Sequence, residues 1–341
     1  MNLQPIRKNK IKKLFDYGIS ADVDQCIVIP IHNAENHITK VLDGVMVNIM
    51  RPSIMVLFLD ACTDESKRVV EEYCAVALNL FPKSKVVSIA AYYSDVDLYE
   101  SFVENFVLFE FPNTTYLLSI QCDIVVCENG LDSIFVSAME NNPDIFMISG
   151  RGTLLFPVSS HLESLRSLAK KFLKKILNTL GADAQLHQEL NFRNKKGLKL
   201  SAEEFFENDE FGRCGYFHEC NVQDINRYLY LSETVIRGPL FFHAPTLRKL
   251  DGFDWKKHRL GNDDHSAALR GWLALGKRCA YLPISYESPL EWGATRSNKS
   301  LVQVIRYIRM RLMERIYHFS GCELNLKSKR LSLPKKEIRN L

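Results

Sequence analysis

Short runs of apolar residues alternate with amphipathic segments through roughly the first 130 residues of the chain. The runs predict strands, because strands in α/β proteins are short and largely buried. The segments between them repeat apolar residues at helical spacing and predict helices. The predicted strands are 25–31, 53–61, 85–90 and 115–126, and the predicted helices are 34–48, 63–78 and 99–111. This order predicts an α/β fold with a mostly parallel sheet flanked by helices, which binds ligands at the carboxyl ends of its strands.

The pattern changes after residue 158 and resumes near residue 234. Residues 161–180 predict a basic amphipathic helix, and the polar segment that follows has little strand character. We interpret 159–235 as a helical and irregular insertion, or lid, over the sheet. The pattern then gives an apolar segment at 234–254, a helix at 263–276 and a strand at 278–286. The predicted organisation is a basic N-terminal extension (1–24), a main domain (25–300, with halves 25–130 and 236–300), and a C-terminal amphipathic helix and tail (301–341).

Composition and charge exclude several classes of protein. The chain is 46% hydrophobic and 25% charged, which is typical of a folded protein rather than a disordered one. Its net charge of +4 is far below the basic excess of a dedicated nucleic-acid binder. No apolar run reaches the ~18–20 residues that span a bilayer, and the N-terminus lacks a secretory signal pattern. We therefore expect a cytoplasmic protein, with peripheral membrane contact through the basic helical faces as the alternative.

The nine cysteines are scattered through apolar runs. An odd number in such positions is typical of buried free thiols in a reducing compartment. One group, Cys214, His218 and Cys220, is close in sequence, but its spacing fits no common zinc site. An ordinary loop is the favoured interpretation there.

Three acidic positions fall where a parallel sheet binds ligands. Asp60 lies at the end region of the second predicted strand, next to its last residue, Asp123 lies near the end of the fourth, and Asp263–Asp264 begin a predicted helix. A carboxylate at a strand end can hold a sugar hydroxyl, a uracil edge or a divalent cation, and Mg²⁺ needs only one or two carboxylates when phosphates supply other oxygens. Adjacent carboxylates at a helix start suit a general base. Taken singly, each position is also typical of a solvated turn or helix cap.

Four stretches in the same order resemble motifs of the family 2 glycosyltransferases. VIPIHNAEN (28–36) is similar to V-I-P-x-x-N-x-E, and LDACTDES (59–66) is similar to D-x-S-T-D-x-S. IRGPLFFHAPTLRKLDGFD (236–254) resembles the acceptor-side stretch that ends in G-G-F-D, and DDHSAALR (263–270) resembles E-D-x-D-L-x-x-R. The resemblance implies a GT-A-type, Rossmann-like fold and an inverting glycosyltransferase that uses a nucleotide-sugar.

The resemblance also implies roles for residues on the donor side. In the family, the loop after the first strand and the aspartate after the second contact the nucleotide. A later segment of small residues and arginine closes over the diphosphate, where an arginine can pair with phosphate. The matching residues here are Pro30, Asn33, Glu35 and Asp60 for the nucleotide, and Arg296 in GATRSN for the phosphate.

Gln121–Cys122–Asp123 stands where the family has its D-x-D element. Asp123 is therefore the implied ligand of a divalent metal, Mn²⁺ or Mg²⁺. Gln121 can still contact a sugar or ribose hydroxyl by hydrogen bonding. Some family members read E-x-Q-x-D here, with an upstream E-x-x-x-x-N helix that resembles Glu100 and Asn105.

The Asp263–Asp264 pair matches the family's E-D, whose second acid is the catalytic base. Counting six residues back from Arg270 selects Asp264 as the implied base, with Asp263 as the neighbouring alternative. Ser266 replaces the later aspartate of the motif.

The sequence therefore predicts a hexosyl or deoxyhexosyl transferase that uses a UDP-, dTDP- or GDP-sugar. Its acceptor would be a glycan, a lipid-linked molecule or a protein, and no nucleic-acid partner is expected. A sugar-phosphate nucleotidyltransferase is one alternative, but it calls for a glycine-rich basic loop after the first strand, which IPIHNAEN lacks. A catalytically inactive GT-A-fold binding protein is the other, and the replacements at Gln121 and Ser266 keep it open.

Overall fold

The computed structural model describes residues 10–18, 23–77, 85–96, 98, 100–150, 228–232, 235, 237–253, 263–282, 284–288, 292 and 337–341. The helices predicted at 161–180 and 301–319, and most of the predicted insertion at 159–235, lie outside these residues. Within the described ranges, no helix has the length and apolar character needed to cross a membrane.

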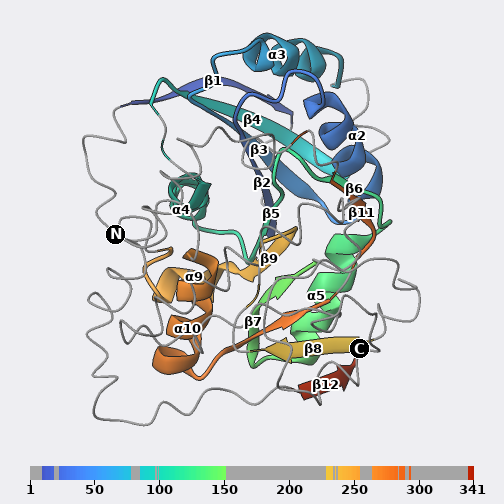
Figure 1. Ribbon diagram of the computed structural model, residues 1–341, viewed down its shortest axis with the longest axis vertical. Helices are drawn as coiled ribbons and strands as arrows, with labels where there is room; N and C mark the ends of the chain where they lie inside the picture. Colours follow the sequence, from blue (N-terminus) through green and yellow to red (C-terminus); the bar gives the residue numbers. More distant parts are fainter. Residues whose placement is uncertain are drawn as a thin grey trace, which may run out of the picture.

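A ten-stranded mixed sheet forms the centre of the fold, in the order β1-β4-β3-β2-β5-β9-β7-β10-β8-β12 (Figure 1). Strands β4, β3, β2 and β5 are parallel neighbours, as are β7 and β10. Only β1, β9 and β8 run against the common direction in this sheet. The bounds are β1 (Ile11–Gly18), β2 (Gln25–Ile31), β3 (Ser53–Asp60), β4 (Val86–Ser94), β5 (Tyr116–Ser119), β7 (Ile145–Ser149), β8 (Tyr228–Ser232), β9 (Leu240–His243), β10 (Arg278–Tyr281) and β12 (Glu337–Asn340). The predicted mostly parallel α/β sheet is confirmed.

Helices cover both faces of the sheet, because alternate side chains of each strand point to opposite sides. On β2, Ile27 and Ile29 belong to one buried core, while Cys26 and Val28 belong to the other. The first core includes α2 (Ile38–Asn48), α3 (Ser66–Ala77) and α5 (Leu131–Asn141). The second includes α4 (Glu100–Glu110), α9 (Ala244–Lys249) and α10 (Asp263–Leu275). Burial on both sides explains why the strands read as nearly continuous apolar runs.

The predicted strands at 25–31, 53–61 and 85–90 correspond to β2, β3 and β4, and the first three predicted helices correspond to α2, α3 and α4. The prediction of one strand over 115–126 is wrong in its extent. Strand β5 ends at Ser119, and the backbone N–H of Ile124 then donates to the Gln121 oxygen (3.1 Å), which closes a turn. The chain pairs again only at β6 (Val125–Val126), which joins β11 (Tyr286–Glu287) in a separate small sheet. Asp123 therefore lies in a turn rather than on a strand.

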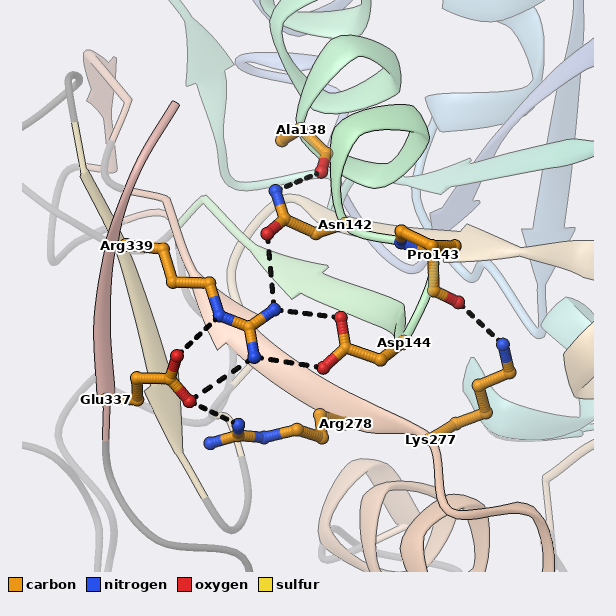
Figure 2. A network of polar contacts seen from close by, with 8 residues as sticks. All are labelled: Ala138, Asn142, Pro143, Asp144, Lys277, Arg278, Glu337 and Arg339. Carbon is orange, nitrogen blue, oxygen red and sulfur yellow. Dashed lines mark hydrogen bonds and ion pairs between the residues drawn. The ribbon is translucent and has the colours of Figure 1, made fainter.

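Strand β12 is fastened to the sheet by an ionic cluster at the amino ends of β7 and β10 (Figure 2). The Arg339 guanidinium donates to both carboxylate oxygens of Asp144 (2.8 and 3.1 Å) and to Glu337 Oε1 (2.7 Å). Arg278 Nη1 donates to the other oxygen of Glu337 at 2.6 Å. These two arginines hold the pKa of Glu337 at about 2, well below its ordinary value, chiefly through the hydrogen bonds from Arg339 and Arg278.

We expect Glu337→Gln to remove a pH-dependent part of the stability. A carboxylate whose pKa is lowered by folding stabilises the fold above its ordinary value of 4.5, and this contribution disappears as the pH falls toward about 2. Urea unfolding at several values between pH 2.5 and pH 7 measures the effect. The variant should have a flatter stability profile below pH 5 than the wild type, while Glu72→Gln, on an exposed face of α3, should follow the wild type. Identical profiles for Glu337→Gln and the wild type would contradict this account.

Candidate active site

The loop after β2 is held against the end of β3 by polar contacts. Pro30 lies within β2, just before this loop. Asn33 has a φ of 51°, a left-handed conformation that asparagine adopts more readily than most residues. Its Oδ1 accepts hydrogen bonds from Thr63 N (2.8 Å) and Thr63 Oγ1 (3.3 Å). His32 Nδ1 lies 2.7 Å from the Asp60 backbone oxygen, so this ring nitrogen carries the proton. The carboxyl ends of β2 and β3 are thereby locked together.

Glu35 continues this attachment to the start of α3. Its backbone N–H donates to Asp64 Oδ2 (3.1 Å), and its own Oε2 accepts from Glu65 N (2.8 Å). Next to it, the Ala34 N–H donates to Ser66 Oγ at 2.7 Å. Glu35 therefore fixes the shape of the loop through its own hydrogen bonds.

Asp60 is the last residue of β3, and only 6% of its surface is exposed. Its Oδ1 accepts a hydrogen bond from Leu98 N (2.8 Å), in the segment that leads into α4. The following residue, Ala61, has a φ of 48° and donates its N–H to the Ser94 oxygen (2.9 Å). The chain thus turns sharply at Asp60, and the Asp60 carboxylate ties β3 to the segment before α4.

The turn that carries Asp123 packs against the start of α2. His37 is the N-cap residue of α2 and is only 5% exposed. Its ring forms a hydrogen bond with the Cys122 backbone and stacks on the Trp292 ring, with ring centroids 4.7 Å apart. Burial lowers the pKa of His37, and the neighbouring Asp123 carboxylate opposes that shift. The Cys122 sulfur accepts a hydrogen bond from the His32 backbone, and burial raises the pKa of this thiol to about 12. Cys122 is therefore a packing residue, and Asp123 is placed beside the β2 loop.

An ionic cluster links the same turn to α10. Gln121 Nε2 lies 3.5 Å from Glu100 Oε2, and Glu100 Oε1 lies 2.9 Å from Arg237 Nη1. The Arg237 guanidinium also donates to both oxygens of Glu104, at 2.7 and 2.9 Å. Finally, the backbone N–H of Arg237 donates to Asp264 Oδ2 at 3.0 Å. A continuous series of contacts therefore runs from Gln121 to Asp264.

This cluster gives a physical reason for the amide at position 121. Glu100 and Glu104 already share one guanidinium. An acidic residue at position 121 would place a third carboxylate beside Glu100, at about the present separation between Gln121 and Glu100. Two negative charges that close repel each other. The amide instead presents an N–H to Glu100 and keeps an oxygen as an acceptor.

The sequence-predicted donor-side residues meet at one edge of the sheet. The loop with Pro30, Asn33 and Glu35, the end of β3 with Asp60, and the turn with Gln121 and Asp123 follow the adjacent strands β2, β3 and β5. Asp264 is linked to this edge by the hydrogen bond that its carboxylate accepts from the backbone N–H of Arg237. Arg296 and the side chain of Asp263 lie outside the described part of the chain. Among the described residues, no three His, Cys, Asp or Glu side chains form a group that could hold a metal ion by themselves.

Sequence reasoning missed Glu104 and Arg237. Glu104 is completely buried within α4, between residues that are themselves buried. An acidic residue on an apolar helix face needs a buried cation or several donors, because an unpaired charge in the interior is costly. The segment YESFVENFVLFEF (99–111) therefore indicates that Glu104 needs a buried partner, but it does not identify that partner, which lies 133 residues away in the sequence.

No protein-family model and no curated protein sequence matches the chain. Among solved structures, GalNAc-T7 with UDP, GalNAc and Mn²⁺ superimposes with a TM-score of 0.50 at 9% identity, over 78% of this chain and 44% of that one. The mannosyltransferase PcManGT from Pyrobaculum calidifontis, in complex with GDP-Man and Mn²⁺, gives 0.46 at 13% identity, over 77% and 56%. S. aureus TarS gives 0.45 at 12% identity, over 78% and 36%. The chain thus matches about half or less of these structures, and the likeness shows a GT-A-type fold.

We expect Gln121→Glu to destabilise the cluster by up to about 1 kcal/mol, the usual size of a partly exposed charge interaction. The added carboxylate would face the Glu100 carboxylate. Combining Gln121→Glu with Glu100→Gln should restore stability, because the double variant again has one amide facing one carboxylate. Urea unfolding of the wild type, both single variants and the double variant isolates this pairwise energy. Additive effects of the two substitutions would mean that Gln121 and Glu100 do not interact.

Proposed function

We propose that this chain is an inverting glycosyltransferase, similar to family 2, that transfers a sugar from a nucleoside-diphosphate sugar to an acceptor hydroxyl. The observation that carries the proposal is the convergence of three acidic positions from distant parts of the sequence. Asp60 ends β3 and Asp123 follows β5, the two strands that flank β2 at one edge of the sheet, and the hydrogen bond from Arg237 N links Asp264 to that edge. Open α/β sheets bind ligands at this edge.

The donor would lie over the loop formed by Pro30, Asn33 and Glu35, with its base or ribose next to Asp60. Hydrogen bonds hold that loop in one conformation before any ligand binds, which reduces the entropy cost of binding. We assign Gln121 to a sugar or ribose hydroxyl, and Arg296 to the diphosphate. The donor class is a UDP-, dTDP- or GDP-sugar, and the acceptor is a hydroxyl of a glycan, a lipid-linked molecule or a protein.

Asp123 fits a divalent cation, Mn²⁺ or Mg²⁺, that arrives with the donor. It supplies one partly exposed carboxylate, and no three potential ligands cluster among the described residues. This set suits a hard cation whose remaining ligands are diphosphate oxygens and water, and it does not suit a metal held by protein alone. When bound, such a cation would supply positive charge next to the departing diphosphate.

Asp264 is the proposed general base, with Asp263 as its neighbour at the start of α10. Its carboxylate would take the proton of the acceptor hydroxyl while that oxygen attacks the anomeric carbon. The bond to the diphosphate breaks on the opposite side, so a single displacement inverts the anomeric configuration. The bond from Arg237 N to Oδ2 holds the carboxylate in a fixed orientation for this step.

A catalytically inactive GT-A-fold binding protein is the second candidate. The observation that favours it is the burial of Asp264, which is only 4% exposed. The decisive experiment incubates the protein with Mn²⁺ and UDP-glucose, UDP-N-acetylglucosamine, UDP-N-acetylgalactosamine, dTDP-rhamnose or GDP-mannose. Release of nucleoside diphosphate supports the transferase. Binding by thermal shift without any release supports the inactive protein, and pyrophosphate release from a nucleoside triphosphate plus a sugar phosphate indicates a nucleotidyltransferase.

We expect Asp264→Asn to lower turnover by roughly 10²–10⁴-fold, which is the usual contribution of a general base. The amide can still accept the Arg237 N–H, so donor affinity should be unchanged. Turnover and donor titration on the same preparation measure both quantities. Full turnover in the Asn variant would exclude Asp264 as the base and direct attention to Asp263.

We expect Asp123→Ala to weaken donor and metal binding together, by at least about tenfold or 1.4 kcal/mol. Titration of UDP in the presence and absence of Mn²⁺ measures the coupling, since a shared site makes each ligand depend on the other. Glu72→Gln on the exposed face of α3 is the control. An unchanged dependence of UDP affinity on Mn²⁺ in the Ala variant would contradict the assignment.

A further inference from the structure

The Arg237 side chain is held rigidly. Its two nitrogens donate in parallel to the two oxygens of Glu104, a geometry that fixes the plane of the guanidinium. Glu104 cannot shift easily, because its side chain is fully buried and its Oε1 also accepts the hydroxyl of Ser119 at 2.6 Å. The Phe253 ring lies beside the guanidinium, with 5.9 Å from Arg237 Cζ to the ring centroid.

The Arg237 main chain is equally constrained. Gly238 and Pro239 follow it, and Pro239 accepts a hydrogen bond from Gly150 N at 2.7 Å. Strand β9 then begins at Leu240, opposite Ser119 of β5. The Arg237 N–H, which donates to Asp264 Oδ2, is therefore fixed by its own side chain on one side and by the sheet on the other.

Net stability is a poor explanation for this cluster. Burying an ion pair costs desolvation energy that the mutual attraction of the charges often only balances, and replacement by apolar residues of similar size is commonly neutral or stabilising. Glu104 is fully buried, and the Arg237 side chain is 14% exposed. A geometric role accounts better for charged groups at this position.

We propose that Arg237 is a positioning residue for the general base. Its guanidinium, clamped by Glu104 and Glu100, fixes the main-chain N–H that orients the Asp264 carboxylate. Through Glu100 and Gln121, the same clamp ties the base to the turn that carries Asp123. This inference rests on the proposed function, since it concerns the orientation of a base in that reaction.

The test replaces the ion pair without leaving a buried charge unpaired. In the double variant Arg237→Met with Glu104→Leu, two apolar side chains take the place of the pair, so the protein should fold with a melting temperature close to that of the wild type. Release of nucleoside diphosphate from UDP-glucose, UDP-N-acetylglucosamine and GDP-mannose with Mn²⁺ gives kcat and KM. We expect kcat to fall by about 10²-fold, the cost of misplacing a catalytic group by about 1 Å. KM for the donor should stay within about twofold of the wild type, because the nucleotide loop is untouched.

Arg237→Lys provides the conservative comparison. A lysine keeps one charged contact to Glu104 but loses the two parallel hydrogen bonds that the guanidinium makes to the Glu104 carboxylate. Its kcat should therefore lie between those of the wild type and the double variant. Glu100→Gln, a change at a partly exposed side chain, should also lower kcat at constant KM, and it keeps the proposal testable if the double variant does not fold.

A matched control lies at the other end of the strands. The Arg339–Asp144 pair also joins a guanidinium to both oxygens of a carboxylate, but next to the amino end of β7 (Figure 2). Arg339→Met with Asp144→Leu should leave kcat and KM unchanged.

A folded Arg237→Met/Glu104→Leu protein with the kcat of the wild type would overturn the proposal, and so would a raised KM at constant kcat. For Glu100→Gln, an unchanged kcat has the same meaning. A wild type that releases no nucleoside diphosphate from any donor would overturn the proposed function and this inference with it. That outcome is recognisable because the control variant would be equally inactive, whereas failure of this inference alone leaves an active wild type.

Discussion

The buried ion pair between Glu104 and Arg237 is the contact on which the arrangement of the candidate site depends. Glu104 belongs to α4, which precedes β5, and Arg237 lies three residues before the start of β9 at Leu240. Strands β5 and β9 are antiparallel neighbours, and Ser119 lies opposite Leu240. In an antiparallel pair, the end of one strand meets the beginning of the other. The residues that follow β5 and those that precede β9 are therefore brought together by register, and the ion pair ties the segment before β9 to α4.

Helix α4 also holds the segment that follows α9. Asn105 Nδ2 donates to the Phe253 oxygen, and Asn105 Oδ1 accepts from Phe253 N, both at 2.7 Å. Gly252 has a φ of 71°, and a Cβ there would lie 2.2 Å from Asn105 Oδ1, so only glycine fits against the amide. Arg270 of α10 donates to the backbone oxygens of Leu250 and Gly252. One helix thus positions both the segment before β9, through Glu100 and Glu104, and the segment after α9, through Asn105.

The sequence predicted the parallel half of the sheet well, because β2, β3 and β4 are buried on both faces and read as continuous apolar runs. It also placed Asp60 at a strand end, since that end coincides with the change from apolar to polar residues. The extent of β5 was missed because Ile124, Val125 and Val126 are apolar but pack after a turn, and apolar character alone does not distinguish a strand from a buried turn. The sequence also does not predict which distant residues pair with one another. Neither the local sequence FVENF (102–106) nor IRGP (236–239) indicates that Glu104 and Arg237 meet, because their contact is set by strand order.

Charge balance connects the amide at position 121 with the proposed cation. Glu100 and Glu104 share the single guanidinium of Arg237, Asp264 accepts from the Arg237 backbone N–H, and Asp123 lies in the same turn as Gln121, which contacts Glu100. This end of β5 is therefore rich in negative charge, and a diphosphate that approached alone would be repelled. A second acid at position 121 would increase that repulsion and would also compete with Glu104 and Glu100 for Arg237. A neutral amide avoids both costs, and leaves Asp123 as the one acidic group of the Gln121–Asp123 turn. On this reasoning the proposed cation would serve mainly to offset charge between a nucleotide-sugar and the protein, so its affinity should depend more on the diphosphate than on the number of carboxylates that the chain provides.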